Sequence, residues 1–408
     1  MTVEELRTQF PILSSQVNGR PLVYLDNAAT SQRPASVVEC WEGMALRTNA
    51  NLHRAVHALA ARATDRYEQT REFVRHYLNA AAREEIIFTS GTTGGINLLA
   101  HSFGEAFLQA GDEILIAECE HHSDIVPWQL LAERKGLRIK VLPVLDDGTP
   151  DLSTLERLLS PRTKIACIAQ ISNVLGILNP VEEIIRTCHA KGCAVLVDGA
   201  QGIVHGKVDV RALDCDFYVF SGHKVFAATG TGVLYGKKAL LEQMPPFLGG
   251  GEMIDTVRFS GTTFAPLPGK FEAGTQDFCA VPTLMPALAL AGEVFADAQL
   301  QRSGEEVKAY VLDALRRNPR IRLFGDPADP AKKVPLFSFC VEGAHHEDLA
   351  LILDKMGVAV RSGQMCAEPL MDRFGVTGML RASFAPYNTL REAETFVESL
   401  GKAIEMLT

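Results

Sequence analysis

Short apolar runs alternate with amphipathic stretches along the first part of the chain. Seven runs rich in β-branched and aromatic residues are expected to be strands: 85–90, 112–118, 138–144, 164–171, 193–200, 216–222 and 232–236. Segments between them carry apolar residues at helical spacing. Continuous apolar strands separated by helices are typical of a parallel sheet covered on both faces. The pattern predicts an α/β fold: a mostly parallel seven-stranded sheet flanked by helices.

The last part of the chain has a different pattern. A passage rich in Gly and Pro, 245–275, is expected to be a long functional loop. Helical spacing resumes over 283–318, and strands are expected at 335–343 and 358–363. A helix is expected between these strands, and another closes the chain over 390–407. This part is expected to form a smaller α+β domain.

Composition narrows the class of protein. The 408 residues are 47% hydrophobic and 22% charged, as in an ordinary globular protein. A net charge of −9 argues against nucleic acid or an anionic membrane as a partner. No signal-peptide core is seen, and no apolar run approaches the roughly 20 residues of a membrane helix. Nine cysteines without a CxxC pair indicate a reducing cytoplasm and no metal site.

The most informative residue is Lys224, which follows the apolar strand 216–222. Burial of an unpaired lysine lowers its pKa, and a neutral amine forms a Schiff base with an aldehyde. Ser221 and His223 beside it can hold a phosphate. Together they suggest a lysine that carries pyridoxal 5'-phosphate (PLP). The alternative is a lysine on a surface loop, which is the commoner place for this residue.

Two polar residues lie at the carboxyl end of the expected strand 193–200. A carboxylate at the carboxyl end of a buried strand lies where open α/β sheets bind ligands. Asp198 can pair there with a pyridinium nitrogen, and Gln201 can donate to the phenolic oxygen of the cofactor. The alternative for Asp198 is a helix N-cap.

Two further turns carry candidate side chains. The small-residue turn 90–97 can cradle a phosphate with its backbone N–H groups and the hydroxyls of Thr92 and Thr93. It can equally be a strand-to-helix turn without a ligand. His121, the first of a histidine pair, can stack on a flat cofactor and move protons.

Cys366 is the best candidate for a reactive thiol, because it lies in a loop after a strand rather than within one. The alternative interpretation is that Cys366 is a small apolar residue of the core. Arg361 and Arg381 flank the same region, and a guanidinium group suits the carboxylate of an amino acid.

These residues occur within a series of motifs that runs across nearly the whole chain. The motifs are YLDNAAT (24–30), NLHRAVH (51–57), TSGTTGGIN (89–97), EHHSDIVPW (120–128), SNVLG (172–176), VDGAQG (197–202), DCDFYVFSGHK (214–224), FEAGT (271–275), RSGQMCAEPLM (361–371) and LRASFAPYNT (380–389). In their sequence and order the chain resembles the PLP-dependent cysteine desulfurases of the class V aminotransferase superfamily, in particular the SufS/CsdA type (group II).

The resemblance implies a fold and a domain division. The fold is that of the PLP-dependent transferases of fold type I. A large PLP-binding domain is expected over 23–290. A small domain that carries the cysteine loop is expected to combine 1–22 with 291–408.

The resemblance also assigns roles to residues. Lys224 is implied as the Schiff-base lysine and Cys366 as the nucleophile that accepts sulfur. Asn173 joins Arg381 at the substrate carboxylate. Thr275 is implied to reach the phosphate of the other subunit of a homodimer. The remaining implied residues near the substrate are His53 and Arg54.

The implied reaction converts L-cysteine to L-alanine and leaves a persulfide on Cys366. A sulfur-acceptor protein of the SufE/SufU type is expected to take the sulfur for iron–sulfur cluster assembly. The alternatives are a selenocysteine lyase, another PLP-dependent C–S lyase that releases sulfide, or a scaffold that has lost its activity. Four segments depart from the family pattern: Gly94-Gly95, 226–230, Gln276-Asp277 and Gln364-Met365.

Overall fold

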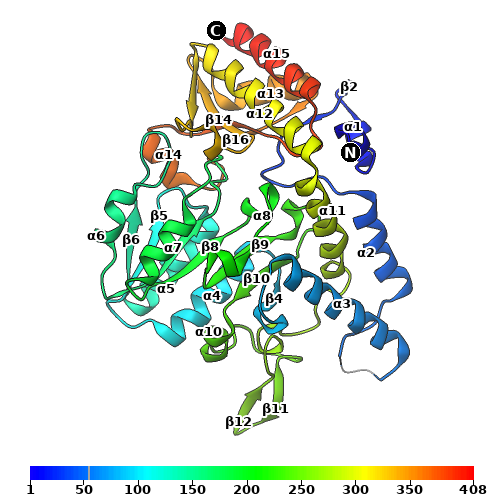
Figure 1. Ribbon diagram of the computed structural model, residues 1–408, viewed down its shortest axis with the longest axis vertical. Helices are drawn as coiled ribbons and strands as arrows, with labels where there is room; N and C mark the ends of the chain where they lie inside the picture. Colours follow the sequence, from blue (N-terminus) through cyan, green and yellow to red (C-terminus); the bar gives the residue numbers. More distant parts are fainter. Residues whose placement is uncertain (54–55) are drawn as a thin grey trace.

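All seven strands expected in the large sheet are present in the computed structural model, which describes residues 1–53 and 56–408 (Figure 1). They are β4 (Ile86–Thr89), β5 (Glu113–Ala117), β6 (Arg138–Leu142), β7 (Thr163–Ala169), β8 (Ala194–Asp198), β9 (Phe217–Ser221) and β10 (Gly232–Gly236). Their order in the sheet is β4-β10-β9-β8-β7-β5-β6. β10 runs antiparallel to both of its neighbours, and the other four pairs are parallel. The prediction of a mostly parallel seven-stranded sheet is confirmed.

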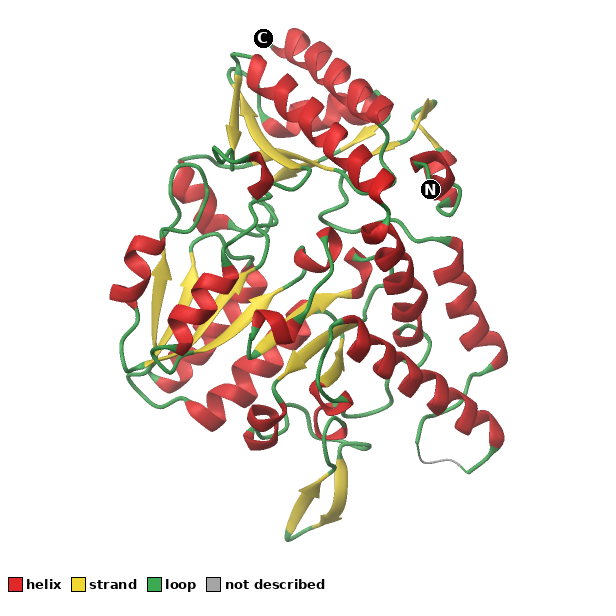
Figure 2. Cartoon of the chain, viewed as in Figure 1, coloured by secondary structure: helices red, strands yellow, loops and turns green. Residues whose placement is uncertain are grey.

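Helices cover both faces of this sheet (Figure 2). They include α2 (Ala35–Arg47), α3 (Ala58–Tyr77), α4 (Thr92–Phe107), α5 (Val126–Lys135), α7 (Val181–His189), α10 (Lys238–Gln243) and α11 (Leu284–Ala296). Side chains alternate between the faces as strand geometry requires. In β5, Ile114 and Ile116 join the apolar cluster with α4 and α5. Leu115 and Ala117 join the cluster with α3, α7 and α11.

A second, antiparallel sheet lies at the end of the molecule where the chain terminates (Figure 1). Its strands are β13 (Ile321–Phe324), β14 (Leu336–Val341), β17 (Met379–Ser383) and β16 (Arg361–Gly363), in that order. Helices α12 (Ala298–Arg317), α13 (His346–Lys355) and α15 (Leu390–Leu407) supply the rest of its apolar cluster. We call this part the small lobe and the part with the seven-stranded sheet the large lobe.

The strand expected over 358–363 is in fact two strands. β15 (Val358–Ala359) pairs in parallel with β3 (Val23–Tyr24), whereas β16 pairs with β17. The chain therefore changes its pairing partner at Val360. The domain division at residues 22/23 and 290/291 stays a prediction.

The passage 245–275 contains a hairpin that the sequence pattern did not indicate. Its strands are β11 (Ile254–Arg258) and β12 (Gly261–Phe264), and every residue of the two strands is exposed except the half-buried Ile254. The hairpin projects from the large lobe at the end opposite α15 (Figure 1). It carries the exposed apolar side chains of Val257 and Phe259.

Shorter elements complete the chain: α1 (Val3–Arg7), β1 (Gln16–Val17), β2 (Arg20–Pro21), α6 (Leu155–Leu158), α8 (Gly202–His205), α9 (Val210–Leu213) and α14 (Glu368–Phe374). Among the described helices, none is by itself long and apolar enough to cross a membrane. Only the bent pair 281–296 and 298–317, at an angle of 79°, meets that length and composition when its members are taken together.

Candidate active site

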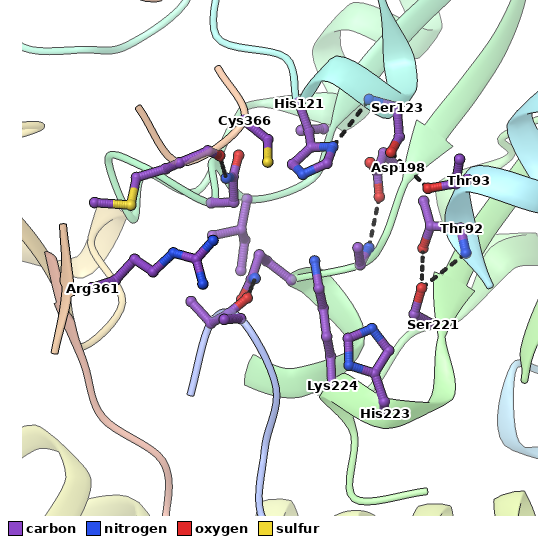
Figure 3. Close-up of a pocket in the computed structure, with 18 of the residues that line it drawn as sticks. Thr92, Thr93, His121, Ser123, Asp198, Ser221, His223, Lys224, Arg361 and Cys366 are labelled. Carbon is purple, nitrogen blue, oxygen red and sulfur yellow. Dashed lines mark hydrogen bonds between the residues drawn. The ribbon is translucent and has the colours of Figure 1, made fainter. Parts of the chain in front are cut away.

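The carboxyl ends of the parallel strands bring the expected site residues to one edge of the large sheet. Asp198 is the last residue of β8, and Ser221 is the last residue of β9, the adjacent parallel strand. Lys224 follows three residues later, in a 3₁₀ turn. A cavity of about 310 Å³ lies over this edge, between the large and small lobes (Figure 3).

Most of the expected site residues line this cavity. They are Thr92, Thr93, His121, Asn173, Asp198, Gln201, Ser221, His223, Lys224, Arg361, Cys366 and Arg381. These residues come from segments up to 289 positions apart in the sequence (92 to 381). The sequence motifs therefore gather in space as a set.

Two expected residues lie elsewhere. Thr275 lines a separate cavity of about 240 Å³ together with Gly94. The ring of His53 meets the ring of Tyr67 edge-on, with 6.2 Å between centroids. Arg54 lies outside the described residues.

The Lys224 side chain points into the cavity (Figure 3). Burial lowers the pKa of its amine, and the nearby Asp198 carboxylate opposes this shift without cancelling it. Burial correspondingly raises the pKa of Asp198, against the attraction of Lys224. Desolvation thus favours the neutral amine, which is the form that attacks an aldehyde.

Asp198 and Gln201 are held by the backbone around them. Oδ1 of Asp198 accepts a hydrogen bond from the N–H of Ala200 at 2.8 Å. Nε2 of Gln201 donates to the carbonyl of Ala28 at 2.8 Å. Both side chains are buried, at 5% and 3% exposure, and both reach the cavity wall. Their orientation is therefore fixed before any ligand enters.

The first turn of α4 forms one end of the cavity. The N–H of Thr92 donates to Oγ of Ser221 at 2.8 Å, and the two hydroxyl oxygens are 2.9 Å apart. The hydroxyl of Thr93 lies 2.7 Å from that of Ser123. Gly91 precedes this turn with φ of 128°, and a Cβ there would come within 3.1 Å of the Ser221 hydroxyl. A helix N-terminus ringed by hydroxyl groups suits a phosphate.

Two histidines of the cavity are neutral at pH 7. Burial, with the positive charge of Lys224 as a second cause, lowers the pKa of both His121 and His223 to about 4. Nδ1 of His121 accepts from the N–H of Ser123 at 3.0 Å. Nδ1 of His223 lies 3.1 Å from Oγ1 of Thr30. A neutral imidazole can stack on a flat ring at low desolvation cost.

Arg381 is buried at 3% exposure and is held at two of its three nitrogens. Nη1 donates to the carbonyl of Asn173 at 2.8 Å, and Nη2 donates to Oδ1 of Asp26 at 3.1 Å. Nε has no hydrogen-bond partner among the residues that the structure describes. Arg361 is half exposed and lies 3.9 Å from Oδ2 of Asp26. A buried guanidinium N–H without a partner is a site for an acidic ligand.

The loop that carries Asn173 is fastened to the small lobe through three consecutive carbonyl groups. Arg381 binds the carbonyl of Asn173, and Oγ of Ser338 donates to that of Val174 at 2.5 Å. Nζ of Lys333 donates to the carbonyl of Leu175 at 2.7 Å. Side chains of the small lobe thus fix a loop of the large lobe at the cavity wall.

Cys366 is on the small-lobe side of the cavity, in the loop between β16 and α14, with its sulfur beside the ring of His121 (Figure 3). It is the exposed cysteine of the nine, all of which lie in the described part of the chain. Met365, which precedes it, is buried at 5% exposure. Its carbonyl accepts from Nδ2 of Asn173 at 2.8 Å.

Residues 23–396 match the family model of the class V aminotransferases. The chain is 46% identical to a probable cysteine desulfurase of Vibrio cholerae over 412 aligned positions, which cover all of both chains. It is 45% identical to a cysteine desulfurase of Serratia proteamaculans over 99% of each chain. The chain belongs to the cysteine desulfurase family of the class V aminotransferases.

Solved desulfurase structures agree with this assignment. The cysteine desulfurase CsdA of Escherichia coli matches all of the chain with a TM-score of 0.91 at 40% identity, and all of that chain is covered. The cysteine desulfurase of Thermococcus onnurineus matches with a TM-score of 0.92 at 35% identity, over all of this chain and 98% of that one. The family is PLP-dependent in general, and the expected fold class is confirmed.

Two residues of the candidate site could not be expected from the sequence. Asp26 lies in the motif 24–30, but only the folded chain brings it to Arg381. Ser123 follows the histidine pair and meets Thr93 through its hydroxyl. No group of three or more His, Cys, Asp or Glu side chains suited to a metal ion occurs in residues 1–53 and 56–408.

Proposed function

We propose that this chain acts as a cysteine desulfurase through Lys224 and Cys366, with PLP as its cofactor. The observation that carries the proposal is that these two side chains line one cavity, although 142 positions separate them (366 − 224). The arrangement suits a substrate that is bound near the Lys224 amine and gives up its sulfur to the Cys366 thiol.

The residues around Lys224 fit PLP. Asp198 would meet the pyridine nitrogen, Gln201 would donate to the phenolic oxygen, and His121 would stack on the ring. Thr92, Thr93, Ser221 and His223 would hold the phosphate, and their hydroxyl and N–H groups at the start of α4 support this assignment. When bound, PLP supplies an aldehyde for the substrate amine and an electron sink for the electrons released at Cα.

Arg381 and Asn173 would bind the substrate carboxylate. The unpartnered Nε of Arg381 is buried, and such a donor gains a charge-assisted hydrogen bond when a carboxylate arrives. Nδ2 of Asn173 donates one hydrogen to Met365, which leaves its second hydrogen for the same ligand. Arg361, half exposed at the mouth, would add attraction at longer range.

Lys224 would move the proton of the reaction at its Nζ. Burial favours the neutral amine, so it can take the proton from the substrate Cα and return a proton to carbon. The neighbouring neutral His121 can share this transfer at a ring nitrogen.

Cys366, in its thiolate form, would accept the sulfur of the substrate. Its sulfur forms a bond to the sulfur of L-cysteine while the substrate Cβ–S bond breaks. The electron pair of that bond goes to Cβ, and Cβ then takes up one proton. This proton balances the one that the Cys366 thiol loses when it becomes a thiolate. L-Cysteine and the thiol thus give L-alanine and a Cys366 persulfide, with atoms and charge balanced.

The position of Cys366 supports delivery to another protein. Its side chain is exposed at the cavity mouth, so a SufE/SufU-type acceptor could reach the persulfide for iron–sulfur cluster assembly. All nine cysteines are free thiols, and we propose a cytoplasmic location, where thiols stay reduced.

A homodimer is part of the proposal. A two-stranded hairpin is marginally stable alone in water, yet β11 and β12 project from this chain with Val257 and Phe259 exposed. A second copy would cover them. Thr275 would then face the phosphate of that copy from its separate cavity. Sedimentation equilibrium at micromolar concentration should give twice the chain mass, and a monomer would contradict this part of the proposal.

Mass spectrometry after incubation with L-cysteine tests the reaction. We expect one added sulfur atom on Cys366 together with alanine release. Cys366→Ser should lose the persulfide and lower alanine release by about a hundredfold or more. Cys279→Ser, which removes a half-exposed thiol outside the cavity, is the matched control and should keep both.

Full turnover of L-cysteine by Cys366→Ser would overturn the proposal in favour of a C–S lyase that releases sulfide. Turnover of L-selenocysteine alone by this variant would instead indicate a selenocysteine lyase, because selenium leaves without a protein thiol. Protein that stays colourless with added PLP would indicate an inactive scaffold.

A further inference from the structure

The backbone beside the Cys366 thiol adopts an unusual conformation. Met365 and Cys366 have φ of 54° and 57°, so two consecutive residues with side chains lie in the left-handed region. Each such residue costs on the order of 1 kcal/mol and persists only where the surrounding structure holds it. The contacts that hold this loop therefore determine where the sulfur of Cys366 lies.

His122 holds the loop at two points. Its backbone N–H donates to the carbonyl of Cys366 at 2.7 Å. Its ring Nε2 accepts from the N–H of Glu368 at 3.0 Å, across 246 positions of sequence. The two bonds lie on either side of Ala367. His122 therefore fixes both the position and the direction of the segment that follows the thiol.

The ring contact needs an acceptor at the position of Nε2. A nitrogen that accepts from a backbone N–H does so through its lone pair. A side chain without an acceptor at the Nε2 position would leave the N–H of Glu368 without this partner.

The preceding residue, His121, faces the other way. Its ring lines the cavity that holds Lys224, and the Cys366 sulfur lies beside it (Figure 3). Adjacent residues of one turn thus contact the candidate cofactor site and the cysteine loop. The peptide between them is rigid, so the turn fixes one relative to the other.

We propose that His122 is a positioning residue for sulfur transfer. It holds the strained Cys366 loop so that the thiol faces the substrate sulfur, and it acts through the loop rather than on any reacting atom. The inference rests on the proposed function, since it concerns the step in which Cys366 accepts sulfur. The residue acts after substrate binding, so its loss should lower kcat and leave KM for L-cysteine nearly unchanged.

Two variants separate the acceptor from the volume of the ring. His122→Phe keeps a flat ring but removes the acceptor. His122→Gln places an amide oxygen near the position of Nε2 and restores it. Both keep the backbone bond to Cys366. His345→Phe is the matched control, because this exposed histidine also accepts a backbone N–H, that of Glu347, on the surface of the small lobe.

Steady-state alanine release gives the first measurement. His122→Phe should lower kcat between about tenfold and about a hundredfold, since small displacements of a reacting group cost that much. KM should stay within about threefold, and the cofactor absorbance and Tm should match the unsubstituted chain. His122→Gln should recover most of kcat. His345→Phe should leave both kcat and KM unchanged.

Hydrogen exchange of the peptide 363–370 gives a second measurement that needs no turnover. The N–H of Glu368 should exchange at least about tenfold faster in His122→Phe and return toward the original rate in His122→Gln. Unchanged exchange and unchanged kcat in His122→Phe would overturn the proposal. So would a loss of Tm or cofactor that matches the loss of kcat, because the role would then be structural only.

The failure of the proposed function would be recognised separately. In that case the unsubstituted chain would form no persulfide on Cys366, whereas the exchange experiment would still report whether His122 holds the loop.

Discussion

Asp26 accepts a hydrogen bond at 3.1 Å from Arg381, a residue of the cavity wall that lies 355 positions away in the sequence. The carboxylate fixes one arm of the guanidinium group while the carbonyl of Asn173 fixes another. Of the three guanidinium nitrogens, Nε alone has no hydrogen-bond partner among the described residues. The pair therefore orients the arginine before the substrate arrives.

Removal of the Asp26 carboxylate should weaken substrate binding. A hydrogen bond to a charged group contributes about 1.5–3 kcal/mol, so Asp26→Ala should raise KM for L-cysteine about tenfold or more. Asp26→Asn keeps an oxygen acceptor and should raise KM less. Steady-state kinetics with the three chains checks this order, and an Ala variant with unchanged KM would contradict it.

Lys224 should be the residue that binds the cofactor covalently. Burial lowers the pKa of Lys224, Lys270 and Lys333, that of Lys333 to about 7, but only Lys224 of the three lines the candidate site. Borohydride reduction of the PLP-loaded protein should fix the cofactor to the peptide that contains Lys224. Lys224→Ala should abolish the adduct and Lys333→Met should keep it. An adduct on Lys333 would show that reactivity follows the pKa alone.

The glycine pair in the first turn of α4 should respond unequally to alanine. A Cβ at Gly95 would come within 2.6 Å of Cγ2 of the fully buried Val219. Gly95→Ala should therefore cost about 1–3 kcal/mol of unfolding free energy. A Cβ at Gly94 meets only the hydroxyl of the exposed Ser90, which can rotate away.

Gly94→Ala should accordingly be neutral or stabilising by up to about 1 kcal/mol, from helix propensity. Urea unfolding of both variants checks the contrast. Equal losses of stability in the two variants would mean that Val219 can move aside as easily as Ser90.

Lys333 should make stability depend on pH. Its amine donates to the carbonyls of Leu175 and Gly325, and burial lowers its pKa from 10.5 to about 7. Between these two pH values the unfolded chain binds a proton that the folded chain does not. Stability from this residue therefore rises with pH across that window, and the desolvation cost is fully present below about pH 7.

The comparison with Lys333→Met isolates this effect. As pH rises from 7 to 9, the unfolding free energy of the unsubstituted chain should increase relative to that of the variant. The increase should be up to about 1.4 kcal/mol per pH unit. Urea titrations of the cofactor-free proteins measure the difference. A difference that does not change with pH would show that the amine stays protonated in the folded chain.

The large lobe was predictable because most strands of its sheet are buried on both faces and form continuous apolar runs, β6 at the edge being the exception. The same pattern placed Asp198 and Lys224 at strand ends, where parallel strands bring residues together. The hairpin β11–β12 escaped prediction because its strands are exposed and carry no such periodicity. The change of pairing at Val360 depends on β3, which lies more than 330 positions earlier.

The contacts within the site were less predictable than its members. Motif order placed His121, Cys366 and Arg381 in the cavity. It could not indicate that Asp26 orients Arg381 or that His122 holds the loop of Cys366, because these contacts join segments 355 and 246 positions apart in the sequence.

The nine free thiols differ in exposure, and this difference allows sulfur loading to be measured on the unsubstituted chain. Cys119, Cys167, Cys188, Cys193 and Cys215 are buried, and Cys40, Cys279 and Cys340 are half-buried, whereas Cys366 is exposed. A bulky alkylating reagent should therefore modify Cys366 first. After a pulse of L-cysteine the reagent alkylates the outer sulfur of the persulfide instead of the thiol. A dithiol reductant releases the label from the alkylated persulfide but not from the alkylated thiol, so the released fraction measures how much of the protein is loaded with sulfur, without any substitution in the chain.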